Sequence, residues 1–338
     1  GLAGMFIIDD DISKNLSLPS EYGVDDFPVI IQDKDFNQDG SFKYFSDFRD
    51  KLMGKKGETI LVNGVISPVL KARKSMIRLR ILNGSNARIY HLNFDDKRMF
   101  HIIASDGGLL EKPVMAHSIK LAPAERAEIL VDISDGKMPI LRHKMHMQKS
   151  ANRMSGMMMM QSIQGKKQEF DIFQIDARSV STSDKKIPDN LVKHDNPSVR
   201  SISKKRVFKL QMQMGPQLMF GAMSGSTDLL KINGKSMNIN RIDEVVKAGS
   251  VELWEIENTS MMPHPFHIHN VQFKIVTRQS KIKGHELGFK DVVLVRPHET
   301  VQVLIKFPQF SDAKTPYMYH CHILEHEDHG MMGQFVVV

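Results

Sequence analysis

The chain has very little cysteine and no long apolar run. Cys321 is the only cysteine among 338 residues, so a disulfide framework within the chain is excluded. No apolar stretch approaches the roughly 18 residues that a membrane-spanning helix needs, and we expect no membrane partner. A charged-then-apolar leader is missing too. Because the chain starts at Gly1 rather than Met, we expect that an N-terminal piece was removed or is not recorded.

A pronounced excess of one charge is also absent. The 46 Lys and Arg residues are scattered among 39 Asp and Glu residues, which leaves a net charge of +7. The basic clusters, such as Lys55-Lys56 and Lys204-Lys205-Arg206, are short. A solvated basic surface explains this pattern, and we expect no nucleic-acid partner.

Methionine and histidine, in contrast, are abundant. The chain contains 23 methionines and 15 histidines. Thioethers and imidazoles both bind soft or borderline metal ions. The composition is therefore a first indication of copper.

Short segments that alternate apolar with polar residues are distributed along the chain. This period of two is typical of half-buried strands, and Asn-Gly, Asp-Gly and proline-containing turns separate the segments. No segment has a long period of 3.6 residues. We therefore predict an all-β protein built from sandwiches. The clearest strand segments are 29–32, 76–82, 128–133, 251–256 and 301–307.

One series of motifs occurs twice in the same order, which predicts two copies of one β-sandwich. A polar segment rich in Pro and Ser lies between the copies at 177–201 and suits a linker. The second copy reads His267-Ile-His269 where the first reads His91-Leu-Asn93, and the first copy has no cysteine. We expect the second copy to carry the metal. The matched motifs are LVNG, RLRILNGS and LAPAERAEILVDI in the first copy, and KING, ELWEIENTS and VRPHETVQVLIKF in the second.

The two histidine-rich motifs HPFHIH (264–269) and HCHILEHEDHGMM (320–332) predict two groups of metal ligands. Alternate side chains of a strand face opposite sides, so His320 and His322 share one face while Cys321 lies on the other. His267 and His269 likewise share a face. Four imidazoles from two neighbouring strands suit copper or zinc.

On the opposite face, Cys321 needs partners of its own. His326 and Met331 follow it by five and ten residues along a loop that turns at Gly330, and His264 can reach the same side. Two histidines, a thiolate and a weak axial methionine form a blue-copper electron-transfer site, whereas zinc gains little from a thioether. The pattern therefore favours copper.

These two motifs resemble the last two copper-binding motifs of the multicopper oxidases, and in particular the laccase-like periplasmic cuprous oxidases of bacteria. The likeness extends through GLAGMFIIDD, VDDFPVIIQDKDF, LRILNGSNAR, IIASDGGLL and KDVV. It implies two cupredoxin-like Greek-key β-sandwiches out of a three-domain enzyme. The expected divisions are the tail of domain 1 at 1–13, a domain 2 without copper ligands at 14–176, the linker, and a copper-bearing domain 3 at 202–338.

The resemblance also implies roles for individual residues. His264, Cys321, His326 and Met331 would hold a type 1 copper that takes electrons from substrate, with Cys321 as the catalytic electron-transfer ligand. Glu327 corresponds to an acidic residue that relays protons to oxygen. The ligands of the trinuclear cluster, which reduces dioxygen to water, would be His267 for the type 2 copper and His269, His320 and His322 for the type 3 pair.

The expected electron donors are Cu(I) and small aromatic reductants, with dioxygen as acceptor and a role in copper tolerance. The resemblance further implies a periplasmic location and, for the complete enzyme, a monomer.

Two features depart from the family pattern. The cluster of this family uses eight histidines from four His-x-His motifs, whereas this chain has two such motifs, and His143-Lys-Met-His146 has the wrong spacing. We therefore expect a fragment that lacks most of domain 1 and is a poor oxidase by itself. At the family's substrate site, Met214 and Met262 occupy methionine positions and would bind Cu(I). Met219 and Ser260 stand where the family has aspartates, so a purely thioether site is possible.

Two alternatives remain open at this point. A copper nitrite reductase also has a type 1 site, but its single catalytic copper needs fewer histidines. A non-enzymatic copper-binding or electron-transfer module would keep the blue site without oxygen chemistry.

Overall fold

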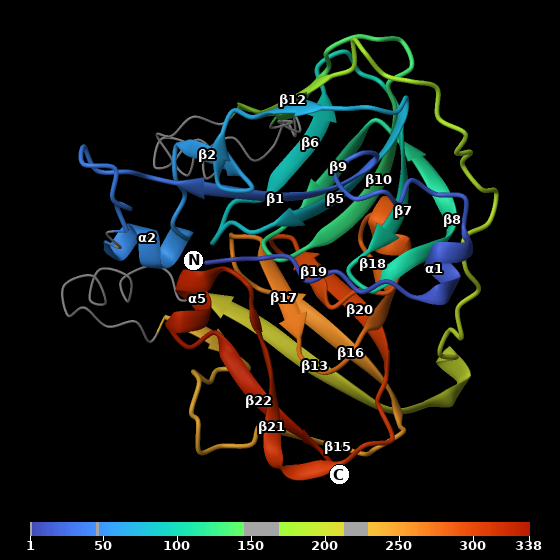
Figure 1. The fold of residues 1–338 in the computed structure, drawn as a ribbon. Helices are drawn as coiled ribbons and strands as arrows, with labels where there is room; N and C mark the ends of the chain where they lie inside the picture. Colours follow the sequence, from blue (N-terminus) through green and yellow to red (C-terminus); the bar gives the residue numbers. More distant parts are fainter. Residues whose placement is uncertain (1, 45–46, 145–168, 213–228) are drawn as a thin grey trace.

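The computed structural model describes residues 2–44, 47–144, 169–212 and 229–338. Two β-sandwiches lie against each other, the first drawn from blue to green and the second from yellow to red (Figure 1). The sequence predictions for His146, Met214 and Met219 fall outside the described residues. The all-β prediction is confirmed.

In the first sandwich, a seven-stranded sheet of order β3-β2-β1-β5-β10-β7-β8 packs on a five-stranded sheet of order β4-β12-β11-β6-β9. Alternation places Tyr90, Leu92 and Phe94 of β6 in the core. The strands are β1 Asp26–Lys34, β2 Thr59–Val62, β3 Val65–Ile66, β4 Val69–Lys71, β5 Met76–Asn83, β6 Tyr90–Phe94, β7 Phe100–Ser105, β8 Gly108–Ala116, β9 Ser118–Leu121, β10 Arg126–Asp132, β11 Ile140–His143 and β12 Phe170–Asp176.

In the second sandwich, two five-stranded sheets have the orders β14-β13-β16-β20-β18 and β15-β22-β21-β17-β19. Strict alternation along β16 buries Trp254 and Ile256 in a second, separate core. The strands are β13 Ile202–Met212, β14 Leu230–Ile232, β15 Glu244–Val246, β16 Val251–Asn258, β17 His264–Ile268, β18 Phe273–Arg278, β19 Val292–Val295, β20 Thr300–Lys306, β21 Asp312–Cys321 and β22 Met332–Val337.

The helices of the described residues are short. They are α1 Asp11–Asn15, α2 Phe48–Met53 and α5 Leu324–Asp328, together with the 3-10 turns Val199–Ser201 and Gly284–Leu287. This agrees with the absence of a long 3.6-residue period in the sequence. Across the part of the chain that the structure describes, no helix has the length and apolarity needed to cross a membrane.

The predicted repeat is visible in the strand orders. The series β1-β5-β10-β7 and β12-β11-β6-β9 of the first sandwich match β13-β16-β20-β18 and β22-β21-β17-β19 of the second. The connection at 177–201 follows the surface of the first sandwich, and its Leu191 belongs to that sandwich's core. The proposed domain boundaries stay predictions.

The two sandwiches meet through close backbone contacts. A Cβ at Gly107, in the turn between β7 and β8, would lie 2.5 Å from Cβ of Phe289 in the second sandwich. On another side, α2 packs against α5 (Figure 1). There, a Cβ at Gly54 would lie 2.3 Å from Ala87 Cβ and 2.8 Å from Ile323 Cγ2. Glycine is required at both positions because a Cβ would collide with Phe289 at Gly107 and with Ala87 and Ile323 at Gly54.

Candidate metal centres

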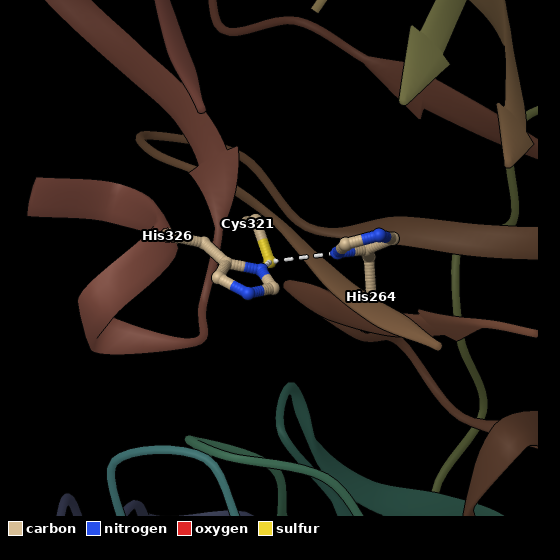
Figure 2. A group of neighbouring side chains, drawn as sticks. All are labelled: His264, Cys321 and His326. Carbon is tan, nitrogen blue, oxygen red and sulfur yellow. Dashed lines mark hydrogen bonds between the residues drawn. The ribbon is translucent and has the colours of Figure 1, made fainter. Parts of the chain in front are cut away.

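Three soft or borderline ligands meet inside the second sandwich. Sγ of Cys321 lies 3.5 Å from Nδ1 of His264 and 3.5 Å from Nδ1 of His326. All three side chains are fully buried, and Figure 2 shows the two imidazole rings on either side of the sulfur. Such a group has the donors of a small metal site.

The strand register explains how these residues meet. Cys321 ends β21 and lies opposite Phe266 of the antiparallel β17, whose first residue is His264. After β21 the chain makes the single turn of α5, which returns His326 toward the sulfur. Met331 is also fully buried in this core, and its carbonyl accepts a hydrogen bond of 3.0 Å from the Cys321 N–H.

The far ring nitrogens of the two histidines have partners that select the tautomer. Nε2 of His326 donates to the Leu52 carbonyl of the first sandwich at 2.9 Å. Nε2 of His264 lies 2.8 Å from Oγ of Ser260, whose hydroxyl hydrogen can go to the oxygens of Asn258 or Met262. His326 therefore carries its proton on Nε2 and its Nδ1 lone pair faces the sulfur, and the Ser260 hydroxyl allows His264 the same arrangement.

Burial keeps these ligands neutral in the metal-free chain. It lowers the pKa of His326 to about 4 and the pKa of His264 well below its usual value. It also raises the pKa of the Cys321 thiol far above its ordinary value. A bound cation would oppose that rise because it stabilises the thiolate directly.

A second group of imidazoles lies on the opposite side of the same strands. His267 pairs with His320 across β17 and β21, and Nε2 of His320 lies 3.2 Å from Nε2 of His269. The ring centroid of His322 is 5.3 Å from that of His320 and 5.6 Å from that of His267. The predicted division of the two motifs between two faces is therefore observed.

This second group opens onto a cleft of about 960 Å³, which His267 and His269 line. Burial and the charge of neighbouring imidazoles lower the pKa of His267 to about 2. Burial also lowers the pKa of His322 to about 4, with His320 contributing. These rings are consequently neutral ligands at ordinary pH.

Glu327 lies beside the second group. Its Oε2 is 3.2 Å from Nδ1 of His320, which is also 3.0 Å from the Cys321 carbonyl. Burial alone would raise the pKa of Glu327, but the hydrogen bond from His320 and the charge of the nearby imidazoles lower it below its usual value. The carboxylate therefore remains ionised next to the histidines.

Of the predicted substrate site, the structure describes Met262 and Ser260 but not Met214 and Met219. Met262 is described and is 5% exposed, so its thioether is not at the surface. The Ser260 hydroxyl contacts His264, a role that the aspartate comparison alone did not indicate. The backbone carbonyls of Leu52 and Asp291 contact His326 and His267, each through one ring nitrogen, at 2.9 Å and 2.8 Å. Sequence reasoning missed both, since backbone atoms leave no trace in side-chain motifs.

The donor atoms fit copper. The buried group combines a thiolate with two imidazoles close to a methionine, which is the donor set of blue-copper sites, and the all-imidazole group suits copper as well. A structural zinc site would more often use further thiolates or a carboxylate.

Comparisons with known proteins agree with this chemistry. The family model described as multicopper oxidase matches residues 201–338. The multicopper oxidase mco of Staphylococcus haemolyticus is 35% identical over 342 residues, which include all of this chain and 64% of that protein. The chain thus spans about two thirds of the length of such relatives.

Solved structures give the same result. The McoA multicopper oxidase of Aquifex aeolicus is 33% identical with a TM-score of 0.85, over 100% of this chain and 71% of that one. The laccase-like multi-copper oxidase CueO of Ochrobactrum sp. is 32% identical with a TM-score of 0.79, over 98% of this chain and 70% of that one. Among the relatives found by sequence rather than by structure, the cell division protein FtsP of Xenorhabdus nematophila is 35% identical over all of this chain and 66% of that protein.

Proposed function

Because this chain belongs to the multicopper oxidase family, we propose that it works in an oxidase that takes electrons from Cu(I) or small aromatic donors and passes them to dioxygen. In this proposal, His264, Cys321, His326 and Met331 hold the type 1 copper, His267 the type 2 copper, and His269, His320 and His322 the type 3 pair. Bound copper supplies the one-electron chemistry at both sites and the binding of oxygen at the second.

One observation carries the proposal. Cys321 belongs to the buried group, and its two neighbours in the chain, His320 and His322, belong to the group on the opposite face. The covalent backbone therefore connects the two candidate centres through a few bonds. A protein that only stored copper would not need its two sites joined in this way.

The protein's own groups prepare both sites. Leu52 and Ser260 orient the imidazoles around Cys321, which limits their movement when the oxidation state of a bound ion changes. Glu327, ionised at rest, is placed to take up a proton beside His320 and to pass it to the oxygen-binding face. Burial excludes water from the Cys321 side, while the cleft leaves the imidazole side open to a small molecule.

The substrate proposal uses the thioethers. Cu(I) prefers thioethers over hard oxygen ligands, so Met262, with Met214, would bring a substrate Cu(I) close to His264. Conversion of Cu(I) to Cu(II) in the periplasm would then support copper tolerance. Solved structures similar to this chain include a Campylobacter jejuni multicopper oxidase described as a metallo-oxidase, which is 28% identical.

The four histidines of the His-x-His motifs are half of the set that a trinuclear cluster in this family uses. We propose that the cleft beside His267 and His269 receives the other half from a further domain. The chain by itself would then hold a type 1 copper and behave as an electron-transfer module, which is the second candidate function. One relative, FtsP, is named for cell division and not for an oxidase activity, so the second candidate needs the same test.

Oxygen uptake by the copper-loaded chain, with Cu(I) as donor, tests the proposal against Cys321→Ser. We expect a blue absorption band that is lost in the variant, together with little oxygen uptake by the chain alone. A native chain that takes up Cu(II) without turning blue would contradict the type 1 assignment. Rapid oxygen uptake by the native chain that disappears in Cys321→Ser would contradict the need for four further histidines.

A further inference from the structure

We infer that Arg126 and Asp106 of the first sandwich are positioning residues for His267, acting through Asp291. The inference concerns the metal-free protein and rests on the proposed function only for its use, since His267 is the ligand assigned to the type 2 copper. It gives the sandwich without copper ligands a direct part in the second metal centre.

The first contact fixes the His267 ring. Its Nδ1 lies 2.8 Å from the carbonyl oxygen of Asp291, and a carbonyl can only accept. Nδ1 therefore carries the proton, and the lone pair is on Nε2. A histidine that binds a metal needs this kind of outer partner to hold both its tautomer and its orientation.

Asp291 is itself held by the first sandwich. Both of its carboxylate oxygens accept from Arg126, each at 2.7 Å, in a bidentate pair. The backbone N–H of Arg126 donates to Oδ1 of Asp106 at 2.8 Å, and the Arg126 guanidinium donates to the Asp106 carbonyl at 2.9 Å. A bidentate pair defines direction as well as distance, so Asp291 has little freedom to rotate.

Neighbouring contacts make this arrangement rigid. Lys290 is completely buried, and its Nζ lies 2.8 Å from Oδ2 of Asp106 and 3.1 Å from Oε1 of Glu125. The Phe289 carbonyl accepts from the Gly107 N–H at 2.8 Å and from the Ser105 hydroxyl at 2.7 Å. The end of β7 and the turn after it thus hold in place the three residues that precede β19, 289–291.

The pairing with Arg126 also decides which oxygen of Asp291 contacts the histidine. Oδ1 of Asp291 lies 3.9 Å from Nδ1 of His267, beyond hydrogen-bond distance, because Arg126 occupies it. The neutral carbonyl is therefore the partner of His267. Without Arg126, the carboxylate would be free to turn toward the ring or away from it.

The test is nitrogen NMR of histidine-labelled, metal-free full chain, comparing Arg126→Met and Arg126→Lys with the native protein. His267→Gln identifies the resonances. We expect a single Nδ1-protonated tautomer for native His267, a shifted or mixed tautomer in Arg126→Met, and partial recovery in Arg126→Lys. Arg206→Met is the control, because Arg206 makes a bidentate pair with Glu252 in the second sandwich that is more deeply buried than the pair of Arg126 with Asp291.

A Cu(II) titration supplies the second measurement. We expect Arg126→Met to weaken copper binding at the imidazole group about 10-fold or more, while the blue absorption of the Cys321 group is retained. Unchanged His267 resonances in a folded Arg126→Met chain would overturn the inference. If the native chain bound Cu(II) without the blue absorption of the Cys321 group but the resonances responded as expected, the proposed function would fail while the inference stood.

Discussion

The matching strand orders of the two sandwiches place β11 and β6 of the first where β21 and β17 lie in the second, and the two strand pairs are used differently. In the first, His143 of β11 lies opposite Leu92 of β6 and stacks on Phe170 with ring centroids 6.2 Å apart. In the second, Tyr319 of β21 lies opposite Ile268 of β17. The candidate metal ligands follow directly after Tyr319, so one fold supports a packed core in one copy and a candidate metal centre in the other.

The matched Pro-x-Glu turns differ in a second way. Glu299 is neutralised within its own sandwich by Arg278, at 2.8 Å. Glu125 instead receives Lys290 from the other sandwich. The first sandwich therefore depends on the second for its charge balance, and in return it supplies the Leu52 carbonyl and Arg126. The comparison teaches that the first sandwich is a structural part of both candidate centres.

The largest expected effect separates the two copies by chemistry. Cys321→Ser should remove the blue absorption and reduce electron transfer by roughly 1000-fold or more, because in the proposed function the Cys321 thiolate would connect the buried centre to the imidazole group. His143→Phe, in the first copy, should change either quantity less than about twofold. Reduction kinetics of the copper-loaded chain measure both. A Cys321→Ser protein that kept the blue absorption would contradict this distinction between the two copies.

The next effect concerns charge balance between the sandwiches. Glu125→Gln leaves Lys290 buried with Asp106 as its remaining carboxylate, and we expect a loss of about 3 kcal/mol in unfolding free energy. Urea denaturation followed by fluorescence of the single tryptophan, Trp254, reports on the second sandwich, and circular dichroism reports on both. We expect the two curves to separate in this variant.

Glu299→Gln is the control for that experiment. Its loss falls within one sandwich, so the two denaturation probes should still coincide. Separation in Glu299→Gln but not in Glu125→Gln would show that the interface does not depend on Lys290.

A smaller effect is expected where α2 meets α5. Gly54→Ala should cost about 2–3 kcal/mol and shift the blue absorption, because the new Cβ would collide with Ala87 and Ile323 close to His326. Gly64→Ala is the matched control, since Gly64 also has a positive φ, of 81°, but nothing lies within 4 Å of its Cβ position. That variant should cost about 1 kcal/mol and leave the spectrum unchanged.

The smallest effect, when counted per pH unit, is a pH dependence that both copies share. Burial lowers the pKa of His143 and of His326 to about 4, against 6.5 in the unfolded chain. The unfolded state then binds more protons, so stability is fully present above about pH 6.5 and falls as the pH drops toward 4. Each ring should contribute at most about 1.4 kcal/mol per pH unit.

Metal-free denaturation at several pH values checks this expectation. His143→Phe should reduce the slope of the unfolding free energy against pH by the contribution of the His143 ring. His326→Phe should reduce it by the contribution of the His326 ring. Equal slopes in all three proteins would contradict it.

Sequence reasoning predicted a large part of this molecule. Alternation predicted the strands around Trp254 and Ile129, because a half-buried strand must alternate whatever its neighbours are. The repeat predicted the two sandwiches. The same rule of alternation predicted that Cys321 and its flanking histidines face opposite sides, and the structure agrees.

The sequence by itself thus determined which side chains can bind a metal and on which face of a strand they lie, since both depend on residue type and local period. Only the tertiary structure decided how those ligands are held. Leu52 lies 274 residues before His326, and Arg126 lies 165 residues before Asp291. Contacts of this kind depend on how two sandwiches dock, and docking is set by the shape and charge of whole surfaces rather than by any local pattern.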